Sequence, residues 1–304
     1  MSTLKNYVSL IKFSHTIFAM PFAMIGFFLG LQSPDRPAFG TAEIILKFIL
    51  VLVCMVTARS AAMAFNRYLD SDIDAKNPRT KVREIPAGII KASNALTFVV
   101  VNCLVFIVAT FFINRICFYL SPIALFVILF YSYTKRFTPL CHLVLGLGLS
   151  LAPVGAYLAV TGVFNIIPVL FALSVICWTG GFDIIYALQD VDFDQSQKLY
   201  SIPSQLGKKN ALVVSALLHV LSAFFVVYAG ITGHFHWLYW IGIAVFIGML
   251  IYQHSIVSPN DLSRVNIAFM TANGIASVVF GVLVIADLLI LKKPVGPFNF
   301  LLFI

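Results

Sequence analysis

Residues 94–113 read NALTFVVVNCLVFIVATFFI, a run of 20 positions without one charged side chain. A helix needs about 20 mostly apolar residues to cross the hydrocarbon core of a bilayer. The run is apolar on every side, whereas the strands of a membrane β-barrel alternate apolar and polar positions. Residues 94–113 therefore predict a membrane-spanning α-helix, and the same rule applies to the rest of the chain.

About nine such runs cover most of the sequence. They predict an all-α integral membrane protein, because only helices and closed barrels satisfy their backbone polar groups in lipid. We expect one polytopic domain over residues 1–304 and no separate soluble domain. The predicted spans lie near residues 10–31, 44–67, 94–113, 117–134, 139–162, 164–188, 209–232, 236–257 and 266–291.

The composition supports lipid as the main solvent of the chain. Apolar residues make up 61% of the sequence, and Asp, Glu, Lys and Arg together only 11%, against roughly 25% in an ordinary soluble protein. These values exclude a soluble enzyme, a disordered chain and a nucleic-acid-binding domain. The five Cys are scattered singly in apolar runs, so we interpret them as small core residues and not as a metal or disulfide framework.

The net charge of +8 predicts an orientation in the membrane and not a polyanionic partner. With nine spans, fourteen Lys and Arg residues fall on the side of the N-terminus and five on the other, and Arg59 lies inside the second span. Cytoplasmic loops of membrane proteins carry an excess of Lys and Arg. We therefore expect the N-terminus in the cytoplasm, in a bacterial inner membrane.

Acidic residues gather in two short stretches, each at the cytoplasmic end of a predicted span. We call residues 66–84 the first acidic segment and residues 183–194 the second. Ionisable groups at the edge of the apolar region are costly and mark functional sites by default. Eight of the 12 acidic residues lie in these two segments: Asp70, Asp72, Asp74, Glu84, Asp183, Asp190, Asp192 and Asp194.

Both segments have the spacing of a metal site built from oxygen ligands. Asn66, Asp70 and Asp74 are four residues apart, as are Asp190 and Asp194, so each set shares one face of a helix. Carboxylates at this spacing repel each other unless a cation lies between them. Oxygen ligands suit a hard divalent ion, and we expect Mg²⁺ at Asp70, Asp74, Asp190 and Asp194.

Basic residues beside the acids indicate a polyphosphate ligand. Arg79, Lys81 and Arg83 follow the first three aspartates, and Lys135, Arg136 and Lys12 lie on the same predicted side. Arg and Lys bind phosphate oxygens that a metal leaves open. Each segment has an Asp-xxx-Asp pair and then an Ile-Pro dipeptide. We therefore expect two pseudo-repeated helical bundles around one central cavity, with a half-site from each.

At these residues the sequence resembles the UbiA superfamily of intramembrane aromatic prenyltransferases. The hallmarks are NxxxDxxxD on one helix and YxxxD with DxxxD on another, and here they are Asn66-Asp70-Asp74 and Tyr186-Asp190-Asp194. The Asn77–Thr80 stretch (NPRT) also looks like the family. The phrase FDIIYALQD at residues 182–190 is similar to the 4-hydroxybenzoate polyprenyltransferases and their relatives in menaquinone synthesis.

The resemblance implies transfer of a polyprenyl group from a prenyl diphosphate to an aromatic acid, in ubiquinone or menaquinone biosynthesis. Neutralising the diphosphate lets an allylic cation form in a dry cavity, and aromatic faces stabilise that cation. We expect Asn66, Asp183, Tyr186 and Asp190 to act in catalysis, with Asp190 as the base. Lys12 or Arg67 are candidates for holding the acceptor's carboxylate.

Two alternatives stay open. The acceptor can be a dihydroxynaphthoate of the futalosine menaquinone route in place of 4-hydroxybenzoate. A cation- or proton-coupled secondary transporter also places acids inside a membrane. Transporters, however, keep such groups near the midplane, and the acids here cluster at one membrane face beside Arg and Lys.

Overall fold

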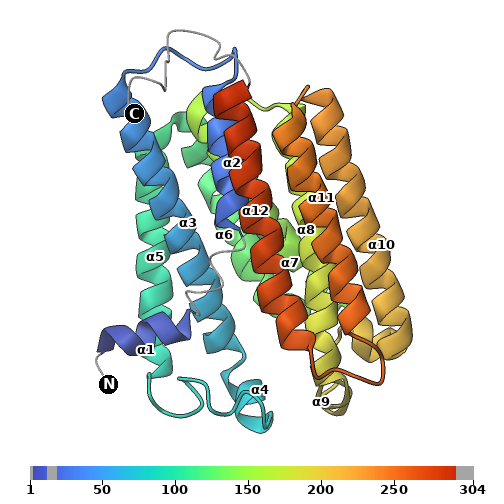
Figure 1. Ribbon diagram of the computed structural model, residues 1–304. Coiled ribbons are helices and arrows are strands. Elements are labelled where there is room, and N and C mark those ends of the chain that lie inside the picture. Colours follow the sequence, from blue (N-terminus) through green and yellow to red (C-terminus); the bar gives the residue numbers. More distant parts are fainter. Residues whose placement is uncertain (1–2, 12–18, 292–304) are drawn as a thin grey trace.

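The computed structural model describes residues 3–11 and 19–291, and all regular structure in these ranges is helical. Eight helices or continuous helical runs are long and apolar enough to cross a membrane. They stand side by side, with the short helices α4 and α9 at one end of the bundle (Figure 1). The eight are α3 (Thr41–Leu69), α5 (Ala92–Ile113), α6 (Arg115–Thr134), α7 (Cys141–Thr161), α8 (Ile166–Ala187), α10 (Ile202–Thr232), α11 (Trp237–Ile256) and the run of η3 (Ile267–Ala272), α12 (Asn273–Ala286) and η4 (Asp287–Leu291).

The predicted spans match these helices to within about three residues, with two exceptions. Helix α10 begins at Ile202, seven residues before the predicted start, because Ser201 and Ser204 form a capping box. Gly207 then leaves the helical conformation (φ 75°, ψ 163°), so the regular helix resumes near the predicted position. The all-α membrane fold predicted from the sequence is confirmed.

The second exception is the first predicted span, near residues 10–31. The structure describes α1 (Thr3–Leu10) and α2 (Met20–Leu31), and residues 12–18 lie outside the described part. Helix α2 has only 12 residues. It packs closely on α7, because a Cβ placed on Gly26 would lie 2.1 Å from the carbonyl oxygen of Pro153.

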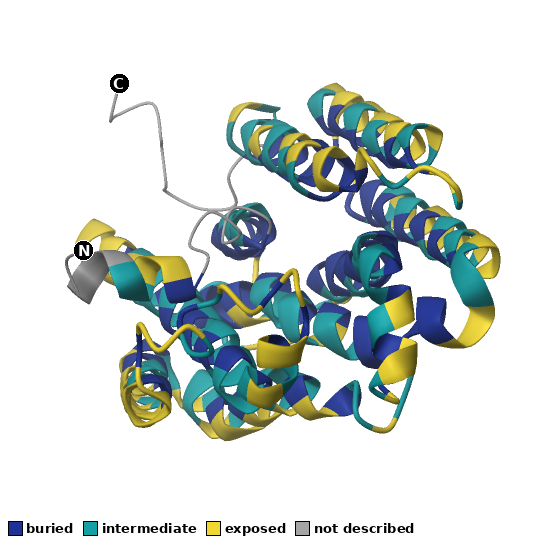
Figure 2. Ribbon diagram, turned by 90° about the horizontal axis from the view of Figure 1, so that it is seen from below, coloured by how far each residue is buried: buried dark blue, intermediate teal, exposed yellow. Residues whose placement is uncertain are grey.

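An aromatic core holds the second half of the bundle together. Trp178 of α8, Phe22 of α2, Phe246 of α11 and Phe280 of α12 are fully buried in one cluster, with ring centroids 5.3 to 6.4 Å apart. Buried residues gather on the helix faces that turn toward one another (Figure 2). Helices α7 and α8 also approach closely, since a Cβ on Gly146 would lie 2.5 Å from the carbonyl oxygen of Ile176.

Two buried charges far from the acidic segments cap helix ends. Lys47 donates hydrogen bonds to the carbonyl oxygens of Ile113 (2.8 Å) and Ala159 (3.2 Å), near the ends of α5 and α7. Asp287 accepts hydrogen bonds from the backbone N–H groups of His236 (2.9 Å) and Tyr239 (3.2 Å), at the start of α11. These groups satisfy backbone atoms that a helix end leaves open.

Candidate active site

The two acidic segments share an unusual backbone feature, because each helix breaks at an aspartate. Helix α3 ends at Leu69 and the short helix α4 (Ser71–Lys76) follows, with Asp70 at φ −91° and ψ 8° between them. Helix α8 leads through the 3₁₀ turn η2 (Leu188–Asp190) into α9 (Val191–Ser196), with Asp190 at φ −106° and ψ 6°. The helix is therefore interrupted at the middle aspartate of each predicted motif, Asp70 in the first segment and Asp190 in the second. Both segments thus have a helix break at the same position of the motif.

Each of the four aspartates predicted to bind metal forms an ion pair with one of the predicted phosphate-binding residues. Arg83 Nη1 binds both carboxylate oxygens of Asp74, at 2.7 and 2.8 Å. Arg79 binds Asp190 through two nitrogens, with Nε 3.0 Å from Oδ1 and Nη2 2.5 Å from Oδ2. Such two-point contacts fix the geometry of both partners.

The other two pairs connect the two segments through one turn. Consecutive residues after α6 contact opposite segments: Lys135 Nζ lies 3.2 Å from Asp194 Oδ1, and Arg136 Nη1 lies 3.0 Å from Asp70 Oδ1. Asn77 of the first segment also donates to Asp190 of the second, at 3.4 Å. The two acidic segments therefore face the same space, at the end of the bundle where α4 and α9 lie (Figure 1).

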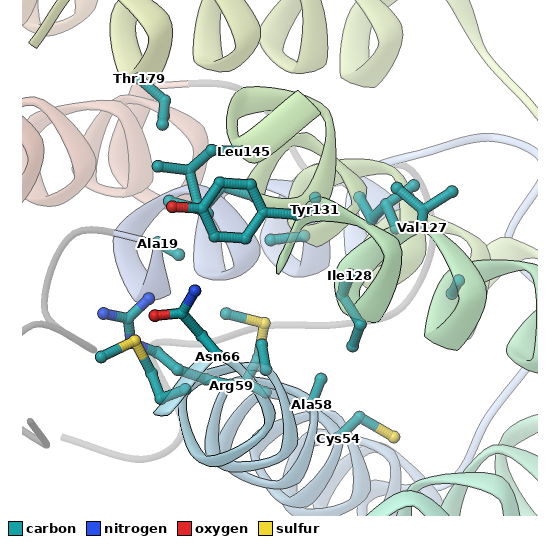
Figure 3. A pocket seen from close by; sticks show the side chains of 18 of the residues that line it. Ala19, Cys54, Ala58, Arg59, Asn66, Val127, Ile128, Tyr131, Leu145 and Thr179 are labelled. Carbon is teal, nitrogen blue, oxygen red and sulfur yellow. The ribbon is translucent and has the colours of Figure 1, made fainter. Parts of the chain in front are cut away.

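A cavity of about 900 Å³ runs from this charged end into the bundle. Its wall comes mostly from α3, α6, α7 and α8, with contributions from α5 and η3. Figure 3 shows Tyr131 of α6 between Asn66 and Arg59 of α3 on one side and Thr179 of α8 on the other. One large cavity thus joins charged and aromatic groups from both halves of the chain.

Away from the charged end, the cavity wall becomes apolar. Ile123 of α6 lines the cavity and is nevertheless 60% exposed. A wall residue that is also on the outer surface marks a lateral opening toward the lipid-facing side of the protein. Other apolar residues in this part are Val51, Met55, Phe106, Ile113, Leu120, Ala124, Val127, Leu151, Leu158 and Phe164.

The predicted site residues divide into three groups. Asn66, Arg79, Arg83, Asp183 and Tyr186 line the cavity directly. Asp70, Asp74, Asp190, Asp194, Lys135 and Arg136 lie in the ion pairs around its charged end. Lys81 is exposed and is not part of the wall, and Lys12 lies outside the described residues.

Sequence reasoning gave no role to Arg59, which the structure places in the cavity wall. Arg59 lies seven residues before Asn66, two helical turns away and on the same face of α3. Arg59 Nε and Arg67 Nη1 are buried, and neither has a hydrogen-bond partner among the described residues. Buried donors of this kind are costly unless a ligand satisfies them. An arginine inside an apolar span was itself the signal that could have identified this position.

An aromatic stack borders the charged end of the cavity. The Arg79 guanidinium lies 5.3 Å from the ring centroid of Tyr186, and Arg79 Nη1 donates to the Tyr186 hydroxyl at 3.0 Å. The ring centroid of Phe269 of η3 lies 4.2 Å from that of Tyr186 and 5.5 Å from that of Phe182. Phe269 lines the cavity too, and the sequence analysis did not single it out.

Two charged groups at the end of the bundle have shifted protonation equilibria. Burial raises the pKa of Asp70, although the charges of Arg136 and Lys135 act in the opposite direction. Burial alone would lower the pKa of Arg79, but its hydrogen bonds to Asp190 and the charge of that carboxylate raise it. A further cation beside Asp70 would therefore favour its ionised form.

The chemistry of the acids fits a hard divalent cation, since the donor set is made of oxygen atoms alone. Among the described residues, no three His, Cys, Asp or Glu side chains come close enough together to hold a metal. In the structure, the four carboxylates form ion pairs with Arg79, Arg83, Arg136 and Lys135. A metal at Asp70, Asp74, Asp190 or Asp194 would therefore take the place of a basic side chain.

Comparison with known proteins identifies the family. The sequence profile of the UbiA prenyltransferase family matches residues 19–275, which is most of the chain. The chain belongs to this family. The UbiA-family membership confirms the resemblance carried by the aspartate motifs, and it makes this integral membrane protein a prenyltransferase and not a transporter.

Relatives of this UbiA-family chain include two 4-hydroxybenzoate octaprenyltransferases. The protein from Shewanella pealeana is 30% identical over 249 residues, covering 80% of this chain and 84% of its own length. The one from Shewanella halifaxensis is 29% identical over 238 residues, covering 77% and 81%. Both alignments span most of each protein, so the likeness is not confined to the motifs.

Solved structures show the same fold. A UbiA homologue from Aeropyrum pernix K1 superposes with a TM-score of 0.79 at 30% identity, covering 90% of this chain and 98% of the homologue. A UbiA homologue from Archaeoglobus fulgidus, solved with DMAPP and Mg²⁺, gives a TM-score of 0.68 at 19% identity, covering 94% and 100%.

Proposed function

We propose that this UbiA-family enzyme transfers a polyprenyl group from a prenyl diphosphate to the ring of an aromatic acid. The proposed acceptor is 4-hydroxybenzoate or a close analogue. The reaction depends on Mg²⁺ and belongs to ubiquinone or menaquinone biosynthesis. The observation that carries the proposal is the shape of one cavity. Its charged end has four acid–base pairs, and its apolar end opens beside Ile123 on the lipid-facing surface. A prenyl diphosphate has the same polarity, with an anionic head and a long apolar tail.

The ion pairs at the charged end are suited to an exchange of partners. Arg79 and Arg83 each hold an aspartate and also line the cavity, so a small side-chain rotation brings them to a diphosphate. Lys135 and Arg136 are paired with Asp194 and Asp70 and do not line the cavity. These four cations and Lys81 are the proposed diphosphate ligands, together with Lys12, which is outside the described residues.

The four aspartates are the proposed magnesium ligands. Once the basic side chains turn to phosphate oxygens, Asp70, Asp74, Asp190 and Asp194 become available for a cation. Mg²⁺, when bound, supplies positive charge that stabilises the diphosphate as it leaves. The Mg²⁺ and DMAPP in the Archaeoglobus fulgidus homologue support this choice of ion.

The acceptor is proposed to bind deeper in the cavity, beside Tyr131. The buried nitrogens of Arg59 and Arg67 can donate to its carboxylate, and Asn66 faces the same space. This adds Arg59 to the Arg67 expected from the sequence. The names of the Shewanella relatives support 4-hydroxybenzoate as the acceptor, and a dihydroxynaphthoate offers the same carboxylate and phenol to these side chains.

The base that accepts the acceptor's phenol proton is better assigned to Asp183 than to Asp190. Asp190 is already a proposed magnesium ligand, whereas Asp183 lines the cavity and has no hydrogen bond to Oδ1 among the described residues. Tyr186 and Phe269 supply the aromatic faces that stabilise the allylic cation.

The distribution of Lys and Arg along the chain indicates how the enzyme is oriented in its membrane. We propose a bacterial inner membrane, with the N-terminus and both acidic segments on the cytoplasmic side, because most Lys and Arg residues lie on that side. The water-soluble acceptor then reaches the charged end of the cavity from the cytoplasm, and the prenyl donor enters from the bilayer.

The test is a product assay with the purified full-length protein in lipid vesicles. Geranyl diphosphate and Mg²⁺ are supplied with 4-hydroxybenzoate in one reaction and with a dihydroxynaphthoate in another, and the extracts are analysed by mass spectrometry. A prenylated 4-hydroxybenzoate that disappears with EDTA supports the proposal. A product from the naphthoate alone assigns the enzyme to the alternative acceptor, and no product from either contradicts the proposed function.

A further inference from the structure

A buried histidine with no role in the preceding assignments contacts Asp183. His142 lies in the first turn of α7 and is 2% exposed. Its Nδ1 atom is 2.7 Å from Asp183 Oδ2, and its Nε2 atom is 3.3 Å from the backbone nitrogen of Ile202 at the start of α10. Both ring nitrogens are therefore engaged, and they join three helices.

These two contacts fix the tautomer of His142. The backbone N–H of Ile202 can only donate, so Nε2 must accept and carries the lone pair. The ring hydrogen then sits on Nδ1 and is donated to the Asp183 carboxylate. A carboxylate that accepts such a hydrogen bond is held in one orientation.

The contact with His142 leaves the other oxygen of Asp183 available. Oδ2 is held by His142, Oδ1 has no hydrogen bond to a described residue, and Asp183 lines the same cavity as Tyr131, one helical turn from Thr179. This arrangement of base and orienting group is the one that positions proton-accepting residues in other enzymes.

We propose that His142 is a positioning residue for the prenyl transfer, holding the Asp183 carboxylate in the orientation in which it accepts the phenol proton of the acceptor. The inference rests on the function proposed above. Asp183 takes the phenol proton, and the ring carbon ortho to the oxygen bonds to C1 of the prenyl group. The electron pair of the C1–O bond leaves with the diphosphate, and the ring hydrogen moves to the phenol oxygen as aromaticity returns. The net product of acid–base transfer is one proton on Asp183.

The experiment compares His142→Phe and His142→Asn, each alone and combined with Asp183→Asn, in the vesicle assay. Asn keeps an N–H donor close to the position of Nδ1, whereas Phe keeps only the ring. We expect His142→Phe to lower kcat by about tenfold or more, which is part of the roughly 10²–10⁴-fold that general base catalysis contributes, with little change in the KM for the prenyl diphosphate. His142→Asn should restore most of kcat, and His142→Phe should have little further effect when Asp183 is already Asn.

A matched control separates this effect from damage to the fold. His254 of α11 is also hydrogen-bonded, to His219 at 2.9 Å, and it does not line the cavity. His254→Phe should leave kcat near the wild-type value in protein that elutes as a single species in size exclusion. A normal kcat in His142→Phe would overturn the inference. So would a loss of kcat that His142→Asn does not restore and that adds fully to the loss caused by Asp183→Asn. In either case, turnover by the wild type would still support the proposed function.

Discussion

The two acidic segments have the same spacing of aspartates and the same helix break, but they obtain their countercharges differently. The first segment contains its own cations, and Arg83 binds Asp74 within it. The second segment, residues 183–194, contains no Lys or Arg. Asp190 is paired with Arg79 of the first segment, and Asp194 with Lys135 of the turn after α6. The second segment therefore takes both countercharges from outside itself, and that of Asp190 comes from the first segment.

The largest expected effect comes from removing one aspartate from either segment. Asp74→Ala and Asp194→Ala should each lower kcat/KM by about 100-fold or more, the size found when one group that stabilises developing charge is removed. Turnover of geranyl diphosphate in vesicles measures it. A large loss in one segment only would show that the two half-sites do not act together.

The next largest effect is expected from removing Arg79, the cation of the first segment that pairs with an aspartate of the second. Arg79→Ala removes both hydrogen bonds to Asp190 and the hydrogen bond to the Tyr186 hydroxyl. We expect the KM for the prenyl diphosphate to rise about tenfold, the value of one hydrogen bond to a charged group. Arg79→Lys should recover only part of this, because Lys cannot make the two-point contact. Unchanged KM in both variants would remove Arg79 from the diphosphate site.

A third variant tests the deeper part of the cavity, away from both segments. Arg59→Met keeps the length of the side chain and removes its buried donors. The KM for the aromatic acid should rise about tenfold, and binding of the prenyl diphosphate should stay the same. Steady-state titration of each substrate at saturating levels of the other measures the two KM values separately. A rise only in the KM for the prenyl diphosphate would contradict the assignment.

The smallest effects are expected at the aspartates between the paired ones. Asp72 and Asp192 are exposed, one in each segment, and neither makes an ion pair with a described residue. Asp72→Asn and Asp192→Asn should change turnover by about twofold at most, as exposed substitutions usually do. They are the matched controls for the paired aspartates, and a loss as large as theirs would require a different set of metal ligands.

Much of this architecture was accessible from the sequence because lipid imposes a simple rule on length and polarity. Span ends such as those of α5 and α11 follow directly from apolar runs, and the aspartate spacing identified both segments. The breaks at Asp70 and Asp190 were not accessible, since four-residue spacing is the same for a continuous helix and for two helices that meet there.

The partners of individual side chains were also beyond the sequence. Ile85-Pro86 and Ile202-Pro203 look alike, yet the first lies in a turn and the second begins α10. His142 contacts Asp183 only because α7 and α8 lie side by side. Such pairings depend on tertiary packing, which one sequence does not record.

The central claim is that both acidic segments together bind a magnesium-dependent prenyl diphosphate. The most direct measurement is calorimetric binding of a non-hydrolysable geranyl thiodiphosphate to the purified protein with and without Mg²⁺, for the wild type, Asp74→Asn and Asp194→Asn. We predict binding that requires Mg²⁺ in the wild type and is strongly weakened by either substitution. Equal binding without Mg²⁺, or full binding in one of the two variants, would contradict the claim.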